Sequence, residues 1–200
     1  MRCLKKPILL FETIKIKNKK ALNLEFHEAR ANLACKDGLK FSLAKKLEPN
    51  LSNLSDGIYR AKLIYSQLGE FESLEIYPYT MRKFESFKLI EVNFNYEKKY
   101  LDRSLIDKAF QKRNECDEII MIKDGLVTDT SIANIAIFDG NSWLTPKTPL
   151  LQGTTKARLL KDGFLKPCDI NVDMLLNAKK FAILNAMIEF KEIEKFKFIE

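Results

Sequence analysis

The 200-residue sequence lacks most of the features that would assign a protein class at once. No apolar run approaches the roughly 18 residues that a membrane-spanning helix requires. The apolar stretch near the start ends at Glu12 and is too short for a secretory signal. Histidine occurs once, as His27, and the four cysteines are scattered without a C-x-x-C pair, so we expect no metal site. We therefore predict a cytoplasmic protein with reduced, mostly buried thiols and no membrane partner.

The composition favours a folded protein with a balanced surface. Apolar residues make up 46% of the chain and include 14 Phe, enough for one substantial core or two smaller lobes. The net charge is +7, and residues 1–20 alone carry seven cations and one anion. A nucleic-acid-binding protein usually spreads its basic residues over one surface. We interpret the N-terminal charge as a solvated lysine-rich hairpin; nucleic-acid binding through this hairpin is the alternative function of another class.

Hydrophobic periodicity and turn residues predict a mixed α/β (α+β) chain with antiparallel hairpins in both halves. In the first half, the patterns predict strands over 8–17, 21–26, 58–66, 71–77 and 86–94, and helices over 27–36 and 39–47. In the second half, they predict helices over 103–113 and 154–161, strands over 118–123 and 132–138, and a strand within 180–190. Asp124-Gly125 is a hairpin turn signal.

The segment 99–160 carries a series of short motifs in a distinctive order. It begins with K-x-L-x-R at Lys99 and continues with D-E ahead of an apolar strand, D-G, V-T-D and A-N. A T-P and the helix-opening G-T-T-K follow, and the first half adds F-E-T-I-K-I and an H-x-x-R at 27–30. In order and spacing the sequence resembles the class IV aminotransferases. These are the fold-type IV pyridoxal-phosphate (PLP) enzymes that include 4-amino-4-deoxychorismate lyase.

The resemblance implies that Lys99 is the Schiff-base lysine, which binds the PLP aldehyde and then moves protons at the substrate carbon. Its neighbour Lys98 is the competing candidate, but only Lys99 stands in the K-x-L-x-R context. Asp129 is expected to face the pyridine nitrogen and keep it protonated. Most relatives have glutamate there, and an ordinary strand-end turn is the structural alternative for Asp129. A second departure is Gln152, where the common family form has proline.

The resemblance also implies a phosphate site built from both halves of the chain. Thr154 and Thr155 open a helix whose N–H groups and dipole favour an anion. Arg30 is expected to add a cation, and the backbone N–H of Ile132 to complete the site. We interpret His27 as structural. Further motif residues are expected to support the site: Asp102, Arg103 and Asn134.

The resemblance implies a two-lobed fold-type IV architecture, with a smaller N-terminal α/β lobe over 1–84 and a larger C-terminal lobe over 90–200 that carries Lys99. It further implies a PLP-dependent homodimer with a small amino-acid-like substrate. We predict a lyase that eliminates pyruvate from 4-amino-4-deoxychorismate to give 4-aminobenzoate for folate biosynthesis. A transferase, acting as a branched-chain or D-amino acid aminotransferase, is the alternative within the family.

Overall fold

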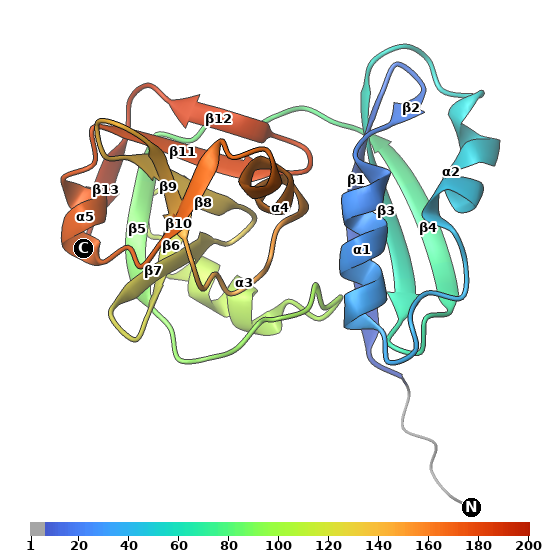
Figure 1. Ribbon diagram of the computed structural model, residues 1–200, viewed down its shortest axis with the longest axis horizontal. Coiled ribbons are helices and arrows are strands. Elements are labelled where there is room, and N and C mark those ends of the chain that lie inside the picture. The colour runs from blue at the N-terminus through green and yellow to red at the C-terminus, as the bar shows by residue number, and fades with distance from the viewer. Residues whose placement is uncertain (1–6) are drawn as a thin grey trace, which may run out of the picture. The chain divides into compact units, whose positions relative to one another are not determined.

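The computed structural model describes residues 7–200, and the chain forms two compact units (Figure 1). Unit 1 contains the chain up to Thr80 together with Lys98–Asp102, and unit 2 contains Met81–Glu97 and Arg103–Glu200. The start of the basic segment, including Cys3, lies outside the described residues. Among the helices that the structure describes, none is both long and apolar enough to span a bilayer.

The described part of unit 1 is an antiparallel four-stranded sheet with the order β2-β1-β3-β4 and two helices. Its elements are β1 (Leu9–Lys17), β2 (Lys20–Ala21), α1 (Leu24–Ala34), α2 (Leu43–Leu51), β3 (Ile58–Ser66) and β4 (Phe71–Pro78). Figure 1 shows α1 alongside β1. The β1 residues Leu10, Ile14 and Ile16 are fully buried in a core shared with both helices. Because side chains alternate along a strand, Glu12 points into the same core, where it is also fully buried.

The predicted strand over 21–26 is wrong, because the chain turns into a helix within it. Asn23 adopts a left-handed conformation (φ 54°, ψ 36°), which asparagine tolerates better than most residues, and α1 begins at Leu24. The helix predicted over 27–36 therefore starts about one turn earlier, and it ends at Ala34.

The second helix starts later than the predicted range of 39–47, at Leu43. Ser42 is its N-cap, and the Ser42 hydroxyl accepts a hydrogen bond from Lys45 N. Glu28 on α1 reinforces this start, since its Oε1 accepts a hydrogen bond from Leu43 N (3.0 Å). The cap rather than the hydrophobic pattern thus sets where α2 begins.

Unit 2 is a mixed sheet of nine strands within the described residues, with the order β10-β9-β8-β7-β6-β5-β13, and β11 pairs with both β8 and β12. Its strands are β5 (Ser86–Glu91), β6 (Glu118–Lys123), β7 (Leu126–Thr130), β8 (Asn134–Phe138), β9 (Trp143–Pro146), β10 (Leu165–Cys168), β11 (Lys180–Asn185), β12 (Glu189–Ile193) and β13 (Lys197–Ile199). Its helices are α3 (Ser104–Gln111), α4 (Thr154–Lys161) and α5 (Val172–Leu176). Phe87, Ile135 and Phe181 are fully buried in its core.

Several predicted elements are confirmed by the structure. The strands predicted over 58–66 and 118–123 and the helix predicted over 154–161 coincide with β3, β6 and α4. The D-G turn joins β6 to β7 as a hairpin, with positive φ at both Asp124 (52°) and Gly125 (75°). Mixed α/β content and antiparallel hairpins in both units are confirmed, and the described cysteines are unpaired, with Cys35 and Cys116 buried.

The segment Lys98–Asp102 belongs to unit 1, which differs from the predicted lobes over 1–84 and 90–200. We expected Lys99 in the C-terminal lobe. Backbone pairing explains the difference, because Lys99 O accepts a hydrogen bond from Phe11 N (3.0 Å), and a second such bond to the start of β1 follows two residues later. The position of Lys99 in the sequence therefore suggests the wrong unit, because the segment Lys98–Asp102 packs against β1 of unit 1.

Candidate functional site

Asp129, near the end of β7, is a buried carboxylate at the centre of a polar cluster in unit 2. It is only 4% exposed. Its Oδ1 accepts a hydrogen bond from Asn134 Nδ2 (2.5 Å), and its Oδ2 accepts one from Leu151 N (2.9 Å). Burial raises the pKa of Asp129 to about 6, although both of these donors oppose the rise. An acid with this pKa can hold or release a proton near neutral pH when a base lies beside it.

Asn134, the first residue of β8, connects Asp129 to the loop that precedes α4. Besides contacting the carboxylate, Asn134 Nδ2 donates a hydrogen bond to Leu151 O (2.9 Å). Gly153 approaches the same side chain so closely that a Cβ at this position would lie 1.9 Å from Asn134 Oδ1. The loop can therefore close on Asn134 only because residue 153 has no side chain.

Replacing Gly153 by alanine is expected to lower the free energy of unfolding by about 2 kcal/mol, because Asn134 or the start of α4 must shift to admit the methyl group. Urea unfolding of the purified protein measures the loss. Gly163→Ala, just beyond the other end of α4, is the matched control. Gly163 has φ +71°, and among the described residues no atom lies within 4 Å of its added Cβ, so only backbone strain of about 1 kcal/mol is expected. Equal losses in the two variants would contradict the role of the Asn134 contact.

The start of α4 combines buried hydroxyl groups with the donors of a helix N-terminus. Thr154 and Thr155 lie in the first turn and are both buried. The N-cap residue is Gly153, which has no side chain to accept hydrogen bonds from the first-turn N–H groups. A helix start with such donors, its positive dipole end and two hydroxyls favours an anion such as a phosphate group.

Lys156, in the same turn, is a buried cation that sequence reasoning did not single out. It is 1% exposed, and its Nζ donates to Gln152 Oε1 (3.3 Å). Burial lowers the pKa of Lys156 to about 8, although the negative charge of Asp129 raises it. A buried ammonium at a helix N-terminus is unfavourable alone, so Asp129 supplies the compensating charge. Gln152, where the common motif has proline, provides an oxygen that a proline side chain could not.

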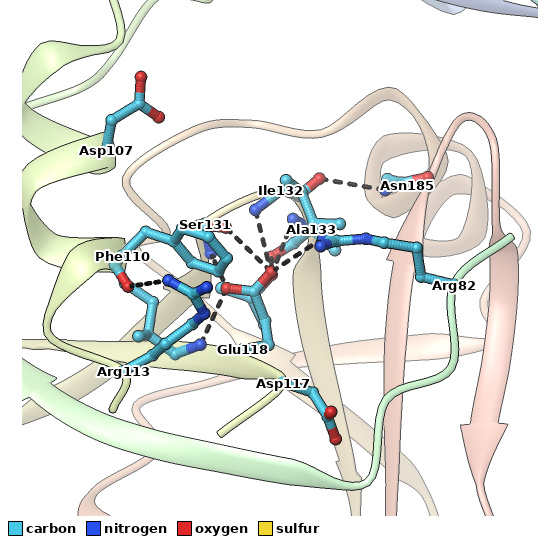
Figure 2. Close-up of polar contacts among 12 residues, drawn as sticks. Arg82, Asp107, Phe110, Arg113, Asp117, Glu118, Ser131, Ile132, Ala133 and Asn185 are labelled. Atoms are coloured by element: carbon cyan, nitrogen blue, oxygen red, sulfur yellow. Dashed lines mark hydrogen bonds and ion pairs between the residues drawn. The ribbon is translucent and has the colours of Figure 1, made fainter. Parts of the chain in front are cut away.

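The backbone N–H of Ile132 lies in the turn Thr130–Ala133, which connects β7 to β8. It donates to Thr130 Oγ1 over 3.3 Å, which is long for a hydrogen bond from an N–H group to an oxygen. The Ile132 carbonyl oxygen accepts a hydrogen bond from Asn185 Nδ2 (3.1 Å; Figure 2). Ile132 is 36% exposed, whereas its neighbours Ser131 and Ala133 are buried.

In unit 1, Arg30 on α1 is paired with the buried Glu12 on β1. Arg30 Nε donates to Glu12 Oε1 (2.9 Å), and Arg30 Nη2 donates to Oε2 (2.5 Å). His27 Nδ1 lies 2.6 Å from the same Oε2, in keeping with the structural role that we predict for this residue. Burial alone would raise the pKa of Glu12, but Arg30 and His27 outweigh it and lower this pKa to about 2. The Glu12 carboxylate therefore fixes the orientation of Arg30.

Lys99 contacts Phe11, which precedes Glu12 on β1. Its Nζ lies 4.6 Å from the centroid of the Phe11 ring, and its carbonyl oxygen accepts the Phe11 N–H. Strand β1 thus anchors both of the predicted site residues of unit 1, with Lys99 at Phe11 and Arg30 at Glu12.

Unit 2 contains the predicted residues Asp129, Ile132, Thr154 and Thr155, whereas Asp102 lies in unit 1. Unit 2 also contains two buried charged residues that sequence reasoning missed. Of the predicted supporting residues, Asn134 contacts the buried aspartate, and Arg103 Nη2 donates to Ser131 O (3.0 Å). The missed residues are Lys156 and the fully buried Glu118. Lys156 is the last residue of the G-T-T-K motif, and Glu118 is the second residue of the D-E motif. The sequence of a motif does not reveal that the charged side chain is buried.

Comparison with known proteins places this geometry in context. The sequence model of the family described as amino-transferase class IV matches residues 97–196. A curated relative from Haemophilus influenzae, named only as an uncharacterized protein, is 35% identical over 188 residues. The match covers 89% of this chain and 97% of the relative.

Solved structures give a similar result. A provisionally assigned 4-amino-4-deoxychorismate lyase from Haemophilus somnus 129pt is 31% identical, with a TM-score of 0.81, and the match covers 90% of this chain and 96% of that one. A provisionally assigned amino-acid aminotransferase from Mesorhizobium loti is 21% identical, with a TM-score of 0.83 over 96% of this chain and 100% of that one. The second likeness shows the fold alone.

Proposed function

Since the chain belongs to the class IV aminotransferase family, we propose that it is a PLP-dependent enzyme that eliminates pyruvate from 4-amino-4-deoxychorismate and forms 4-aminobenzoate for folate biosynthesis. The structural matches confirm the fold-type IV architecture that the sequence motifs imply. The buried Asp129, which Asn134 connects to the loop that precedes α4, is the observation that carries the proposal of a PLP enzyme. The choice of a lyase is supported by the likeness to the Haemophilus somnus protein over nearly its full length.

The chemical groups of the chain fit PLP. The ring nitrogen of PLP is a base, and Asp129 is a buried acid with a pKa near 6. The phosphate is an anion, and the start of α4 offers N–H groups with the hydroxyls of Thr154 and Thr155. The aldehyde requires a primary amine, which Lys99 provides. Bound PLP supplies an electron sink that stabilises negative charge on the substrate carbon beside the amino group.

Each of these residues has a distinct task in the proposed reaction. Lys99 would hold the cofactor at its aldehyde and would move a proton at the substrate carbon. Asp129 keeps a proton at the pyridine nitrogen. Thr154, Thr155 and the N–H of Ile132 would bind the phosphate. For Arg30 the family resemblance implies a further positive charge for the same group. We also propose that the enzyme is cytoplasmic and, from the family resemblance, that it is a homodimer.

Incubation of the PLP-loaded protein with 4-amino-4-deoxychorismate alone tests this proposal. We expect pyruvate and 4-aminobenzoate in equal amounts, without any added 2-oxo acid, because elimination needs one substrate only. Pyruvate is followed by a coupled reduction to lactate, and 4-aminobenzoate is followed by chromatography. The proposal fails if neither product forms while branched-chain or D-amino acids react once a 2-oxo acid is supplied. That result would identify an aminotransferase instead.

A further inference from the structure

Glu118, the first residue of β6, is a fully buried carboxylate to which the proposed reaction gives no task. The four residues that follow it, Ile119–Ile122, are buried and apolar, so the charge lies at the edge of a hydrophobic core. Burial raises the pKa of Glu118, which shows how unfavourable this position is for a charge. A buried charge of this kind needs strong hydrogen bonds to compensate for the loss of water.

Two of the hydrogen bonds that compensate for the burial of Glu118 come from a single residue of the turn Thr130–Ala133. Glu118 Oε2 accepts a hydrogen bond from Ser131 Oγ (2.9 Å), and Oε1 accepts one from Ser131 N (3.3 Å) as well as from Ile119 N (2.8 Å). Figure 2 shows the Glu118 carboxylate directed toward Ser131. Arg82 Nη2 lies 3.8 Å from Oε2, but the Arg82 side chain is 58% exposed and contributes little. The main effect of Glu118 is therefore to fix Ser131.

Fixing Ser131 also sets the direction of the next N–H group. The carbonyl oxygen of Ser131 and the N–H of Ile132 belong to one planar peptide, so the direction of one determines that of the other. Arg103 Nη2 holds that oxygen (3.0 Å), while Glu118 holds the N–H and hydroxyl of the same serine. Asn185 Nδ2 then fixes the carbonyl oxygen of Ile132. The side chains of Glu118, Arg103 and Asn185, which come from separate parts of unit 2, thus hold Ser131 and Ile132 of this turn.

We propose that Glu118 is a positioning residue for the PLP phosphate, because its contacts with Ser131 hold the Ile132 N–H in the direction in which it donates to a phosphate oxygen. This inference rests on the proposed PLP function, in which that N–H belongs to the phosphate site. Glu118 acts only through the turn and does not itself contact the cofactor. Its contribution therefore depends on the phosphate group of the ligand and not on the ring.

A comparison of PLP with pyridoxal, which lacks the phosphate, tests this role. Dissociation constants for both are measured by absorbance and fluorescence titration of the apoprotein. For Glu118→Gln we expect PLP to bind about tenfold more weakly, because a charge-assisted hydrogen bond to the turn is replaced by a neutral one. Binding of pyridoxal is expected to change by less than about twofold. Ser131→Ala, which removes only the hydroxyl contact, is a second variant and is expected to show the same selective loss.

Asp117→Asn is the matched control, because it removes the charge of the neighbouring carboxylate. Asp117 Oδ2 also accepts three hydrogen bonds, but they come from Glu85 N, Ser86 N and Ser86 Oγ at the start of β5. Asp117 points away from the turn in Figure 2. This variant is expected to bind PLP and pyridoxal as the parent does.

The outcomes separate this inference from the proposed function. Equal weakening of PLP and pyridoxal, or unchanged PLP binding in both Glu118→Gln and Ser131→Ala, would overturn the positioning role. If the parent binds neither compound, the proposed function fails, and inorganic phosphate then decides the inference. A rise in the melting temperature of the parent with phosphate that is smaller in Glu118→Gln supports the turn as a phosphate site. The absence of such a rise in the parent overturns it.

Discussion

Replacing Lys99 by alanine is expected to lower kcat for pyruvate release by about a thousandfold or more, the largest effect of any single change in this chain. Alanine cannot bind the cofactor aldehyde and has no group to move a proton at the substrate carbon. The fold is expected to persist, because the segment is attached to β1 by its backbone, through Lys99 O and Phe11 N. The loss is therefore chemical and not structural. Steady-state assays with the PLP-loaded variant, beside an unfolding curve, measure it.

Lys98→Ala is the matched control for this variant. Lys98 is the adjacent lysine in the same segment and carries the same charge, but it stands outside the K-x-L-x-R pattern. The control is expected to keep most of the parent's activity and its visible cofactor absorption. If Lys98→Ala is inactive and Lys99→Ala is active, the assignment of the reactive lysine is wrong.

The second large effect is expected from Arg30→Met, which leaves the buried carboxylate of Glu12 without its main positive partner. The expected loss in the free energy of unfolding is about 3 kcal/mol at pH 7, the range found when one member of a buried ion pair is removed. The structure shows why, since Glu12 is fully buried and receives two hydrogen bonds from Arg30. Urea unfolding of the apoprotein measures the loss independently of any effect on phosphate binding.

The same variant has a defined pH dependence. The pKa of Glu12 is lowered from its ordinary value of 4.5 to about 2, so its contribution to stability is present above pH 4.5 and is lost as the pH falls toward 2. A shift of this size corresponds to about 3 kcal/mol for a fully buried group. The difference in the free energy of unfolding between the parent and Arg30→Met is therefore expected to be large at pH 7 and to disappear as the pH falls to about 2, where the Glu12 carboxylate takes up a proton in the parent as well.

Lys40→Met is a control in the same unit for the Arg30 variant. Lys40 pairs with Glu70 at 3.3 Å, but both side chains are more than half exposed. Breaking this surface pair is expected to cost less than about 1 kcal/mol. A loss in Arg30→Met no greater than in Lys40→Met would contradict the importance of the buried Glu12 network.

The elements that were predicted well are those in which local signals agree. In β6 a continuous apolar run is followed by Asp124-Gly125, whose positive φ angles match a tight hairpin turn. In α4 the glycine N-cap and the hydroxyl residues of the first turn mark the start of the helix. The strand predicted over 21–26 is wrong because its alternation of apolar and polar residues was too short to be decisive. The chain changes direction at Asn23, and only the backbone conformation reveals this change.

The residues of the candidate site also fall into two groups, those that the sequence motifs indicate and those that only the structure reveals. Lys99 and Asp129 could be singled out as candidates because they stand in motifs that resemble a known family, and their roles stay predictions. The burial of Glu118 and Lys156 could not, because a charged residue is normally exposed and only the packing of distant segments shows otherwise. Even the unit to which Lys99 belongs depends on pairing with Phe11, which lies almost 90 residues earlier in the chain.

The covalent attachment of PLP to Lys99 is tested most directly by borohydride reduction of the parent protein incubated with PLP, followed by proteolysis and mass spectrometry. Reduction makes the attachment permanent, and fragment ions distinguish Lys99 from Lys98. We predict that the added mass of the reduced cofactor is found on Lys99, in about one equivalent per chain. Attachment to another lysine, or a scatter of low-level labels over many exposed lysines, would contradict the proposed role of Lys99 and with it the proposed function.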